Sequence, residues 1–466
     1  MKEQRGLNIS AKSFITATVI IFVLMIVTFG LTFLIPGGEY ARIADASGHM
    51  VLDTAGGFTY IEGGIPFWKW LLSPILVLGA EGNGSLIAVI IFLLVLGGVF
   101  NSLDKCGLMR YMLHKITYRF GRNKYKLMAC VTLFFMAMGS FIGSFEECVP
   151  LVPIVVALAV SLGWDALVGI GMSLLAAGCG FAAGICNPFT VGVAQELAGL
   201  SMFSGMWFRG LGFILIYGLL FTFLYRYAKR IEKTDKDYSG AISFEPDLQM
   251  DKGVLCFVGI VSVGILLVLS SVFITALQDY TMIIVAVMFL VAGVLAVLIS
   301  GTTGKVLGAT FLEGVVSVLP AVLMILMANS IKYTMTEAHI LDTILHAAVA
   351  IAGELPKWAV ILFIYFIVLV MNFFIPSGSA KAFLLIPLIV PVAQIFGISP
   401  QLCIVAYAYG DGFSNAFYPT NPVLLISLGL ADVNYGTWAK WSGKFQLLNL
   451  LLTGGLLLVG LMIGYC

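Results

Sequence analysis

Long uncharged runs recur along the chain, and they predict helices that cross a membrane. Three of them cover residues 13–38, 253–278 and 358–379. Each is longer than the roughly 20 apolar residues that span a bilayer as an α-helix. The runs are continuous rather than alternating, which favours helices over a transmembrane β-barrel. We therefore expect an all-α polytopic membrane protein.

The composition agrees with this interpretation and argues against several functions. Of the 466 residues, 60% are hydrophobic and 11% are charged, and the formal net charge is +1. Soluble domains carry about 25% charged residues. The near-zero charge argues against a nucleic acid partner, and we find no nucleotide-binding or metalloprotease motif. The eight cysteines are scattered singly, which indicates packing rather than metal ligation. We expect no enzyme and no cofactor.

Basic residues predict which loops face the cytoplasm. Seven lie between residues 104 and 126 and five between 226 and 236, whereas residues 37–85 carry two. The first loop is therefore expected outside, with a cytoplasmic N-terminus in the plasma membrane. The two basic segments can both be cytoplasmic only if one of the three apolar runs between them enters and leaves the membrane on the same side. We assign a re-entrant hairpin to 127–164.

The second half of the chain repeats the pattern of the first. Asn187-Pro188 and Asn421-Pro422 interrupt two apolar runs, and the surrounding prolines and glycines match at the same offset. Five crossings are expected between the two hairpins, at residues 166–195, 206–225, 253–278, 282–300 and 317–333. Because this number is odd, the second copy is inverted relative to the first. Inverted repeats with broken helices are the usual plan of secondary transporters, with sites at the breaks near midplane.

This plan predicts four parts of the chain. They are a first span and outer loop (1–84), a first repeat (85–227) with hairpin 127–164 and broken helix 166–195, a cytoplasmic linker with two spans (228–305), and a second inverted repeat (306–466) with hairpin 357–397 and broken helix 400–431.

Charged residues at the two hairpin tips are candidates for solute recognition. Glu146 and Glu147 are the only charges between Lys126 and Asp165, and a carboxylate at the bilayer centre costs roughly 2.5–3.5 kcal/mol. Lys381 is at the position equivalent to Glu147. We expect it to attract a carboxylate while the acids attract a cationic group. A tip in cytoplasmic water, or a gate ion pair between Lys381 and Glu147, are the alternatives.

Polar residues at the tips and breaks complete the predicted substrate site. Hydroxyls and open carbonyls at the breaks suit Na⁺ or the cationic end of a solute, so a coupling Na⁺ or H⁺ is compatible with the pattern. Ordinary proline kinks, helix caps and a packing role for Asp411 are the alternatives. The additional candidates are Ser144, Asn187, Ser377, Ser379, Asp411, Asn415, Thr420 and Asn421.

Two further groups are expected to lie outside the site. Glu196 and Arg209 flank an outer turn and are expected to be solvated. Tryptophans near the predicted span ends are expected to anchor the chain at the membrane interface, namely Trp164, Trp358, Trp438 and Trp441.

Three blocks of the sequence resemble a known family. They read EECVPLVPIVVALAVSLGWDALVGIG with GFAAGICNPFTVGVAQELAGL, IPSGSAKAFLLIPLIVPVAQIFGIS, and YGDGFSNAFYPTNPVLLISLGLADVNYGTW. They resemble the YfcC/ArcD basic amino acid antiporters, grouped with DcuC-type C4-dicarboxylate carriers in the ion transporter superfamily. The resemblance implies a homodimer and a transport domain that moves as an elevator. It carries site roles to Glu146, Glu147, Asn187, Ser377, Ser379, Asp411, Asn415 and Thr420.

One departure from that family leaves the substrate open. Thr420-Asn421-Pro422 stands where the family has Thr-Ser-Gly after the second break. We expect a secondary transporter of a small amino acid or related organic ion in the lipid bilayer, with cationic amino acids favoured by the acidic pair. The alternative is a sodium- or proton-coupled transporter of a C4-dicarboxylate or another carboxylate. An ion channel and an intramembrane enzyme are the competing classes.

Overall fold

The computed structural model describes residues 11–44, 50–52, 57–80, 84–120, 123–143, 145–201, 203–232, 246–270, 281–352 and 355–466. Within these ranges the chain is mostly helical, and seven helices are long and apolar enough to cross a membrane. They are Leu86–Lys105, Ala166–Ala183, Met206–Ile231, Gly304–Glu337, Lys357–Phe374, Gly378–Ile395 and Tyr435–Met462. A multi-pass helical membrane protein, as predicted from the sequence, is thereby confirmed.

The N-terminal region contains strands that the all-α prediction missed. Helix α1 (Ala11–Leu34) is followed by two antiparallel pairs, in which β1 (Gly38–Tyr40) pairs with β4 (Phe58–Tyr60) and β2 (Arg42–Ala44) with β3 (Met50–Leu52). Each strand has three residues, too few to show the alternation that marks a strand in sequence. Short helices α2 (Phe67–Leu71), α3 (Ser73–Leu76) and η1 (Val77–Gly79) follow.

The first half then places an interrupted helix after a helical pair. Helices α4 (Gly84–Lys105) and α5 (Leu108–Phe120) lead into the pair and the interrupted helix. These comprise α6 (Lys124–Ala137), η3 (Met138–Ile142), η4 (Glu146–Leu151), α7 (Val152–Ser161), α8 (Ala166–Ile170), η5 (Gly171–Leu175), α9 (Ala176–Ala183), η6 (Pro188–Gly192) and α10 (Val193–Leu197). Helix α11 (Met206–Ile231) closes this half.

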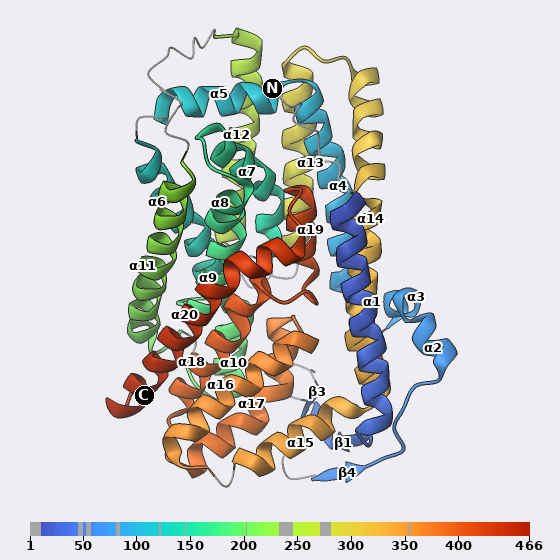
Figure 1. The fold of residues 1–466 in the computed structure, drawn as a ribbon, viewed down its shortest axis with the longest axis vertical. Helices are drawn as coiled ribbons and strands as arrows, with labels where there is room; N and C mark the ends of the chain where they lie inside the picture. The colour runs from blue at the N-terminus through green and yellow to red at the C-terminus, as the bar shows by residue number, and fades with distance from the viewer. Residues whose placement is uncertain are drawn as a thin grey trace.

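The second half has a comparable order of elements. Helices α12 (Leu248–Ser270), α13 (Thr281–Ile299) and α14 (Gly304–Glu337) come first. They are followed by α15 (Ile340–Ala352), α16 (Lys357–Phe374), α17 (Gly378–Ile395), α18 (Pro400–Gly412), η8 (Phe413–Ala416), α19 (Pro422–Leu430) and α20 (Tyr435–Met462). In Figure 1, α5 and α15 run across the long axis near opposite ends of the molecule.

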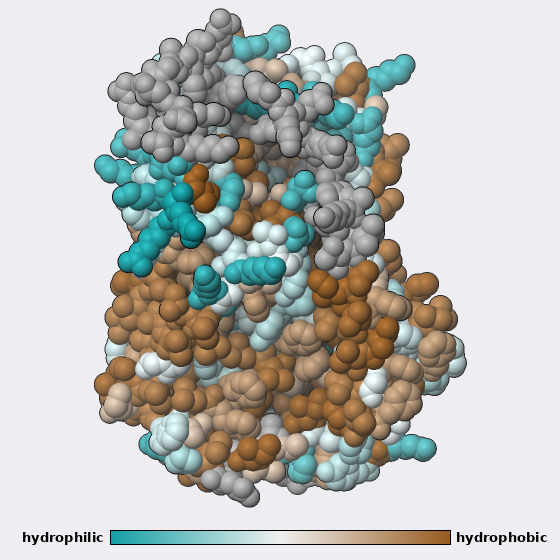
Figure 2. Space-filling model, viewed as in Figure 1, coloured by the Kyte–Doolittle hydropathy of each residue, from teal (hydrophilic) through white to brown (hydrophobic). Residues whose placement is uncertain are grey.

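Polar contacts gather at these two ends. At one end Lys115 of α5 donates to Asp251 of α12 over 2.6 Å. At the other, Asp342 of α15 accepts from the backbone N–H of Tyr40 at 3.1 Å and from Arg42 at 2.8 Å. Figure 2 shows hydrophilic side chains toward the upper end and a broad apolar region below it. The two basic segments expected to share one side do meet, since Lys124 forms an ion pair with Glu232.

Two interrupted helices pack against each other in the middle of the molecule. Helix α18 contacts α9 closely, and a Cβ atom at Gly412 would lie 2.1 Å from the backbone of Ala182. Gly139 faces Ala177 in the same way, with a built Cβ only 2.1 Å from its carbonyl oxygen. Small residues at such crossings let helix backbones approach within van der Waals distance. This packing brings the helix breaks of the two halves together.

Candidate solute site at two helix breaks

The first break follows Gly184, which ends α9 in the left-handed conformation at φ +45°. Two backbone N–H groups that this break leaves without a partner in the helix bond to Ser140 of η3. The Ser140 hydroxyl accepts from Ile185 N at 3.0 Å, and its carbonyl accepts from Cys186 N at 3.1 Å. Since helix ends must find such partners, the preceding helical pair holds the break in place.

Asn187 lies inside this first break and is fully buried. Its Oδ1 accepts from the backbone N–H of Thr190 at 3.2 Å and thus caps η6. Gly143, with φ +78°, lies directly against the amide, because a Cβ there would be 2.3 Å from Oδ1. The predicted opening of the helix before Pro188 is therefore observed, with the Asn187 oxygen engaged by the backbone.

The second break contains a chain of amide hydrogen bonds. Asn421 caps α19 by accepting from Val423 N at 2.9 Å, and its Nδ2 donates to Asn415 Oδ1 at 3.0 Å. Asn415 in turn donates to the carbonyl of Asp411 at 2.8 Å. The two asparagines, together with Asp411 and Thr420, are buried. The structure thus brings these four predicted residues into one cluster.

Lys381 and Asp411 form an ion pair that is closed off from solvent. The Nζ–Oδ1 distance is 2.5 Å, and both side chains have an exposed fraction of 0%. Lys381 also donates to the Ile375 carbonyl at 3.2 Å and to Oδ1 of Asn372. Three oxygens therefore surround the ammonium group. The sequence predicted that Lys381 attracts a carboxylate of the solute, with a gate ion pair to Glu147 as the alternative; in this conformation Lys381 contacts Asp411 instead.

The two halves meet beside this ion pair. A Cβ atom at Gly378 would lie 2.2 Å from the Thr190 methyl and 2.7 Å from Oδ2 of Asp411. Within the described residues, neither Asp411 Oδ2 nor Oγ1 of Thr190 or Thr420 has a hydrogen-bond partner. Side chains from both halves, Thr190 and Asp411, therefore meet at Gly378, and each has a polar atom whose bonding capacity is unused within the described residues.

The remaining predicted residues differ in how far they are exposed to solvent. Glu146 is half-buried and within electrostatic range of Asp411. Ser377 is exposed and Ser379 is half-buried. Ser144 and the side chain of Glu147 lie outside the described residues.

Two predictions about residues outside the site are wrong. Arg209 is fully buried, with Nη2 donating to the Ile185 carbonyl at 3.1 Å. A cation near the carbonyl end of a helix is favourable, so the break draws this side chain inward. Trp438 is also fully buried and donates to the Ala416 carbonyl at 2.8 Å rather than lying at an interface, and Trp164 is buried as well.

Sequence reasoning missed Asn372, which is central to the second break. Its Nδ2 contacts the Asp411 carbonyl at 3.0 Å, the Ser414 hydroxyl at 2.7 Å and Asn415 Oδ1 at 3.0 Å. A single amide in the otherwise apolar stretch AVILFIYFIVLVMNFFI was the available signal, because a buried amide must be hydrogen-bonded. Arg209, Ser140 and Thr190 carried no comparable signal.

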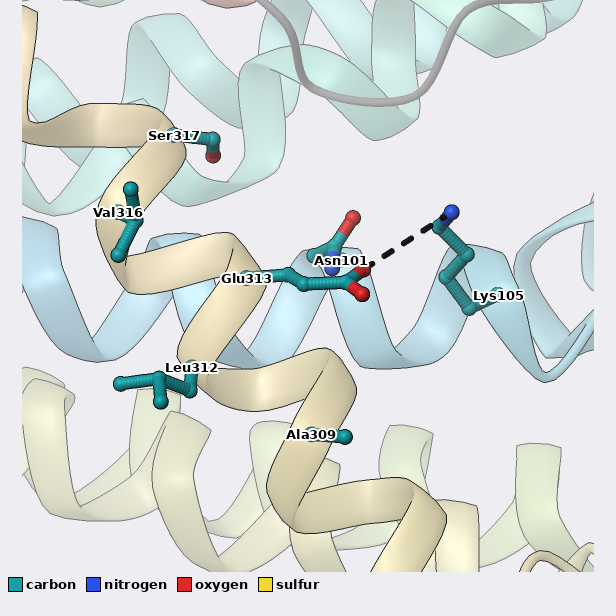
Figure 3. Close-up of a pocket in the computed structure, with 7 residues that line it drawn as sticks. All are labelled: Asn101, Lys105, Ala309, Leu312, Glu313, Val316 and Ser317. Atoms are coloured by element: carbon teal, nitrogen blue, oxygen red, sulfur yellow. Dashed lines mark ion pairs between the residues drawn. The ribbon is translucent and has the colours of Figure 1, made fainter.

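A separate cavity lies between α4 and α14. Figure 3 shows it, with a volume of about 620 Å³ and the Lys105–Glu313 ion pair at 3.9 Å on its wall. None of the predicted site residues lines it. The candidate site is therefore placed at the helix breaks by its side-chain contacts.

Broken helices that bury an ion pair and amides inside a multi-pass chain define a membrane transport protein. Comparison with known proteins agrees with this class. The chain belongs to the DcuC family, C4-dicarboxylate anaerobic carrier, whose model matches residues 14–462. The family resemblance seen in the sequence is confirmed.

Individual relatives have different descriptions. The chain is 29% identical over 386 residues to the Escherichia coli protein named "Putative basic amino acid antiporter YfcC", covering 77% of this chain and 74% of that one. It is 24% identical to an uncharacterized protein of Haemophilus influenzae, covering 96% of each.

Two solved structures are similar at low identity. The YdaH transporter of Alcanivorax borkumensis has a TM-score of 0.48 at 19% identity, covering 97% of this chain and 99% of that one. Neisseria gonorrhoeae MtrF, from a class of antimetabolite efflux pumps, has a TM-score of 0.45 at 15% identity, covering 95% and 94%.

Proposed function

We propose that this protein is a secondary active transporter of a small amino acid or related organic ion, with basic amino acids favoured, and that the solute binds between the two helix breaks. One observation carries the proposal. Asp411 is fully buried, yet one of its carboxylate oxygens has no partner among the described residues and lies near Thr190 of the other half. A buried acid with unused bonding capacity is a functional feature by default.

The charges around the breaks favour a cationic solute. Lys381 and Asp411 neutralise each other, so their pair adds no net charge. Glu146 then contributes negative charge on the side of the first hairpin, and its neighbour Glu147 adds another acid in the sequence. An ammonium or guanidinium group is attracted to such a surface. The name of the Escherichia coli relative agrees with this direction.

The second candidate is a C4-dicarboxylate, which the family description favours. Two carboxylates would have to approach Glu146 and Asp411 while one buried lysine offers the compensating charge. Repulsion between like charges disfavours this arrangement unless an acid is protonated or a cation binds as well. A dicarboxylate carrier would therefore need a coupling H⁺ or Na⁺.

We further propose that Lys381 acts as a built-in cation at Asp411. Its ammonium group is held by an amide oxygen, a backbone carbonyl and a carboxylate. These oxygen ligands also suit hard metal cations. A cationic group of the solute would compete with Lys381 for Asp411, and the lysine would reoccupy the acid once the solute leaves. Transport of a basic amino acid would then proceed without Na⁺.

The two halves are proposed to act as inverted repeats around this site. Each has a helical pair before an interrupted helix, α6 to α10 in one half and α16 to α19 in the other. An elevator movement of these elements against α4 and α14, in a homodimer, would carry the site across the membrane.

Transport by the purified protein in proteoliposomes tests this function. Vesicles loaded with ornithine should take up radiolabelled arginine by exchange, and omission of Na⁺ should not reduce the rate. Succinate and neutral amino acids, each in excess, should leave arginine uptake unchanged. Uptake of succinate without arginine uptake would establish the dicarboxylate alternative instead.

The variant Glu147→Gln tests the acidic pair. Removal of this charge should abolish arginine uptake while the protein still elutes as a folded species, since the solute's cationic group would lose an attracting carboxylate. Glu196→Gln is the matched control, because Glu196 is exposed. Full uptake by Glu147→Gln would contradict the role of the acidic pair.

A further inference from the structure

Arg209 is a fully buried cation without an acidic partner among the described residues. Only Nη2 has a hydrogen bond to the protein, at 3.1 Å to the Ile185 carbonyl, whereas Nε and Nη1 have none within the part of the chain that the structure describes. A guanidinium has five N–H donors and remains charged in proteins. Buried charges are normally paired, so an acceptor is missing on one side of this group.

A second buried donor packs against α11 one turn after Arg209. The hydroxyl of Tyr409 is fully buried and has no hydrogen-bond partner among the described residues. It rests on the same face of α11, because a Cβ atom at Gly212 would be 2.3 Å from it. The Tyr409 hydroxyl also lies within electrostatic range of Arg209. Two unused donor groups on different helices therefore lie along the same turn of α11.

The backbone adds positive potential at the same place. Arg209 is in the first turn of α11, whose N-cap is Gly205 in the left-handed conformation without a capping side chain. The N-terminus of a 26-residue helix carries about half a positive charge and leaves N–H groups free. Tyr465 adds no negative charge here, since its neutral hydroxyl donates to the Gly205 carbonyl at 2.6 Å and offers Arg209 only an uncharged hydrogen-bonding oxygen.

We infer that a small monoanion, a chloride ion or a carboxylate group, binds beside Arg209 at the start of α11. The site is defined by Nε and Nη1 of Arg209 and the hydroxyl of Tyr409. It faces the first break through Ile185 and differs from the Asp411–Lys381 cluster in having no acidic partner among the residues that the structure describes. The inference does not rest on the proposed transport activity.

Binding would link the anion to the position of the first break. Arg209 already holds the Ile185 carbonyl, and an anion on its free edge would fix the guanidinium between two acceptors. A planar carboxylate can accept from two N–H groups on one edge of the guanidinium, from Nη1 or Nε together with the second N–H of Nη2, whereas chloride is held as a point charge. The two ligands therefore share one chemistry but respond differently to Arg209→Lys.

Thermal unfolding of the full-length protein in detergent tests this site. Chloride or acetate replaces a bulky sulfonate anion in steps, while the cation concentration and the ionic strength stay constant. The wild-type melting temperature should rise and saturate with chloride or acetate. Tyr409→Phe should weaken the apparent affinity about tenfold, as expected for the loss of one hydrogen bond to a charged ligand. Gly210→Ala is the control, since nothing lies within 4 Å of the added methyl group.

Charge variants complete the test and separate the two sources of anion. Arg209→Met should lose the saturable response, and Arg209→Lys should retain it for chloride more than for acetate. Competition by the transported solute would identify its carboxylate as the ligand, and absence of competition would identify chloride; both support the site. An identical response of wild type and Arg209→Met would overturn it. If Arg209→Met does not fold, the other two variants decide. The proposed site is then overturned if Tyr409→Phe and Arg209→Lys both bind the anions with wild-type affinity.

Discussion

Removal of one charge from the Lys381–Asp411 pair should destabilise the protein far more than removal of both. Neither side chain is exposed, and the ammonium group contacts the carboxylate at 2.5 Å. Lys381→Met leaves a buried carboxylate without its cation, and Asp411→Asn leaves a buried ammonium without its acid. Loss of one partner of a buried pair costs about 3–5 kcal/mol, because the remaining charge is desolvated without compensation.

The double variant Lys381→Met with Asp411→Asn removes both charges together. Buried ion pairs replaced as a unit are often neutral in stability, so we expect the double variant to unfold within about 1–2 kcal/mol of wild type. The sum of the two single effects would be roughly 6–10 kcal/mol. The difference is the coupling energy between the residues, which a double-mutant cycle measures.

Reversible unfolding in mixed detergent micelles, followed by tryptophan fluorescence, provides the four free energies. Lys357→Met is the matched control, because Lys357 is exposed at the start of α16, and such a surface change should stay within about 0.5 kcal/mol. The reasoning would be refuted by a double variant as unstable as the sum of the single variants. A Lys381→Met protein as stable as the control variant would refute it as well.

Two other predictions concern packing and pH. Gly412→Ala should cost about 1–3 kcal/mol, since the added Cβ would be 2.1 Å from the backbone of Ala182; Gly455→Ala, with nothing within 4 Å, should unfold like wild type. Hydrogen bonds from Lys124 and Tyr125 lower the pKa of Glu232, so this carboxylate stabilises the fold above its ordinary pKa of about 4.3 and the contribution is lost as pH falls through the lowered value. Glu232→Gln should remove that acid-side loss from the pH profile of melting temperature, and an unchanged profile would contradict the assignment.

The positions of the helix breaks could be predicted from the sequence because their cause is local. Proline removes a backbone donor and restricts the preceding residue, and both Asn187 and Asn421 do lie where a helix is interrupted. Their capping bonds to Thr190 and Val423 span two or three residues. Interactions of such short range are encoded in neighbouring sequence.

The ion pair and the buried arginine could not be predicted in the same way. Lys381 reaches an acid 30 positions away on another helix, and only the packing of α17 against α18 decides which acid it meets. Arg209 follows the stretch LSMFSGMWF, which is typical of a loop at the membrane surface. Its burial depends on the carbonyl of Ile185, which becomes free only because α9 ends at the first break.

The two breaks use the same chemical solution but differ in charge. At each, an asparagine caps the helix that follows, and a cation from a neighbouring helix contacts a nearby carbonyl, Arg209 on Ile185 and Lys381 on Ile375. Lys381 has Asp411 as its counter-ion, whereas Arg209 has no acid among the described residues. The surroundings of the first break therefore favour an added anion. The acidic side of the second break, once Lys381 is displaced, favours an added cation. Under the proposed function, a solute that carries both charges would satisfy both preferences, as an amino acid would and a dicarboxylate would not.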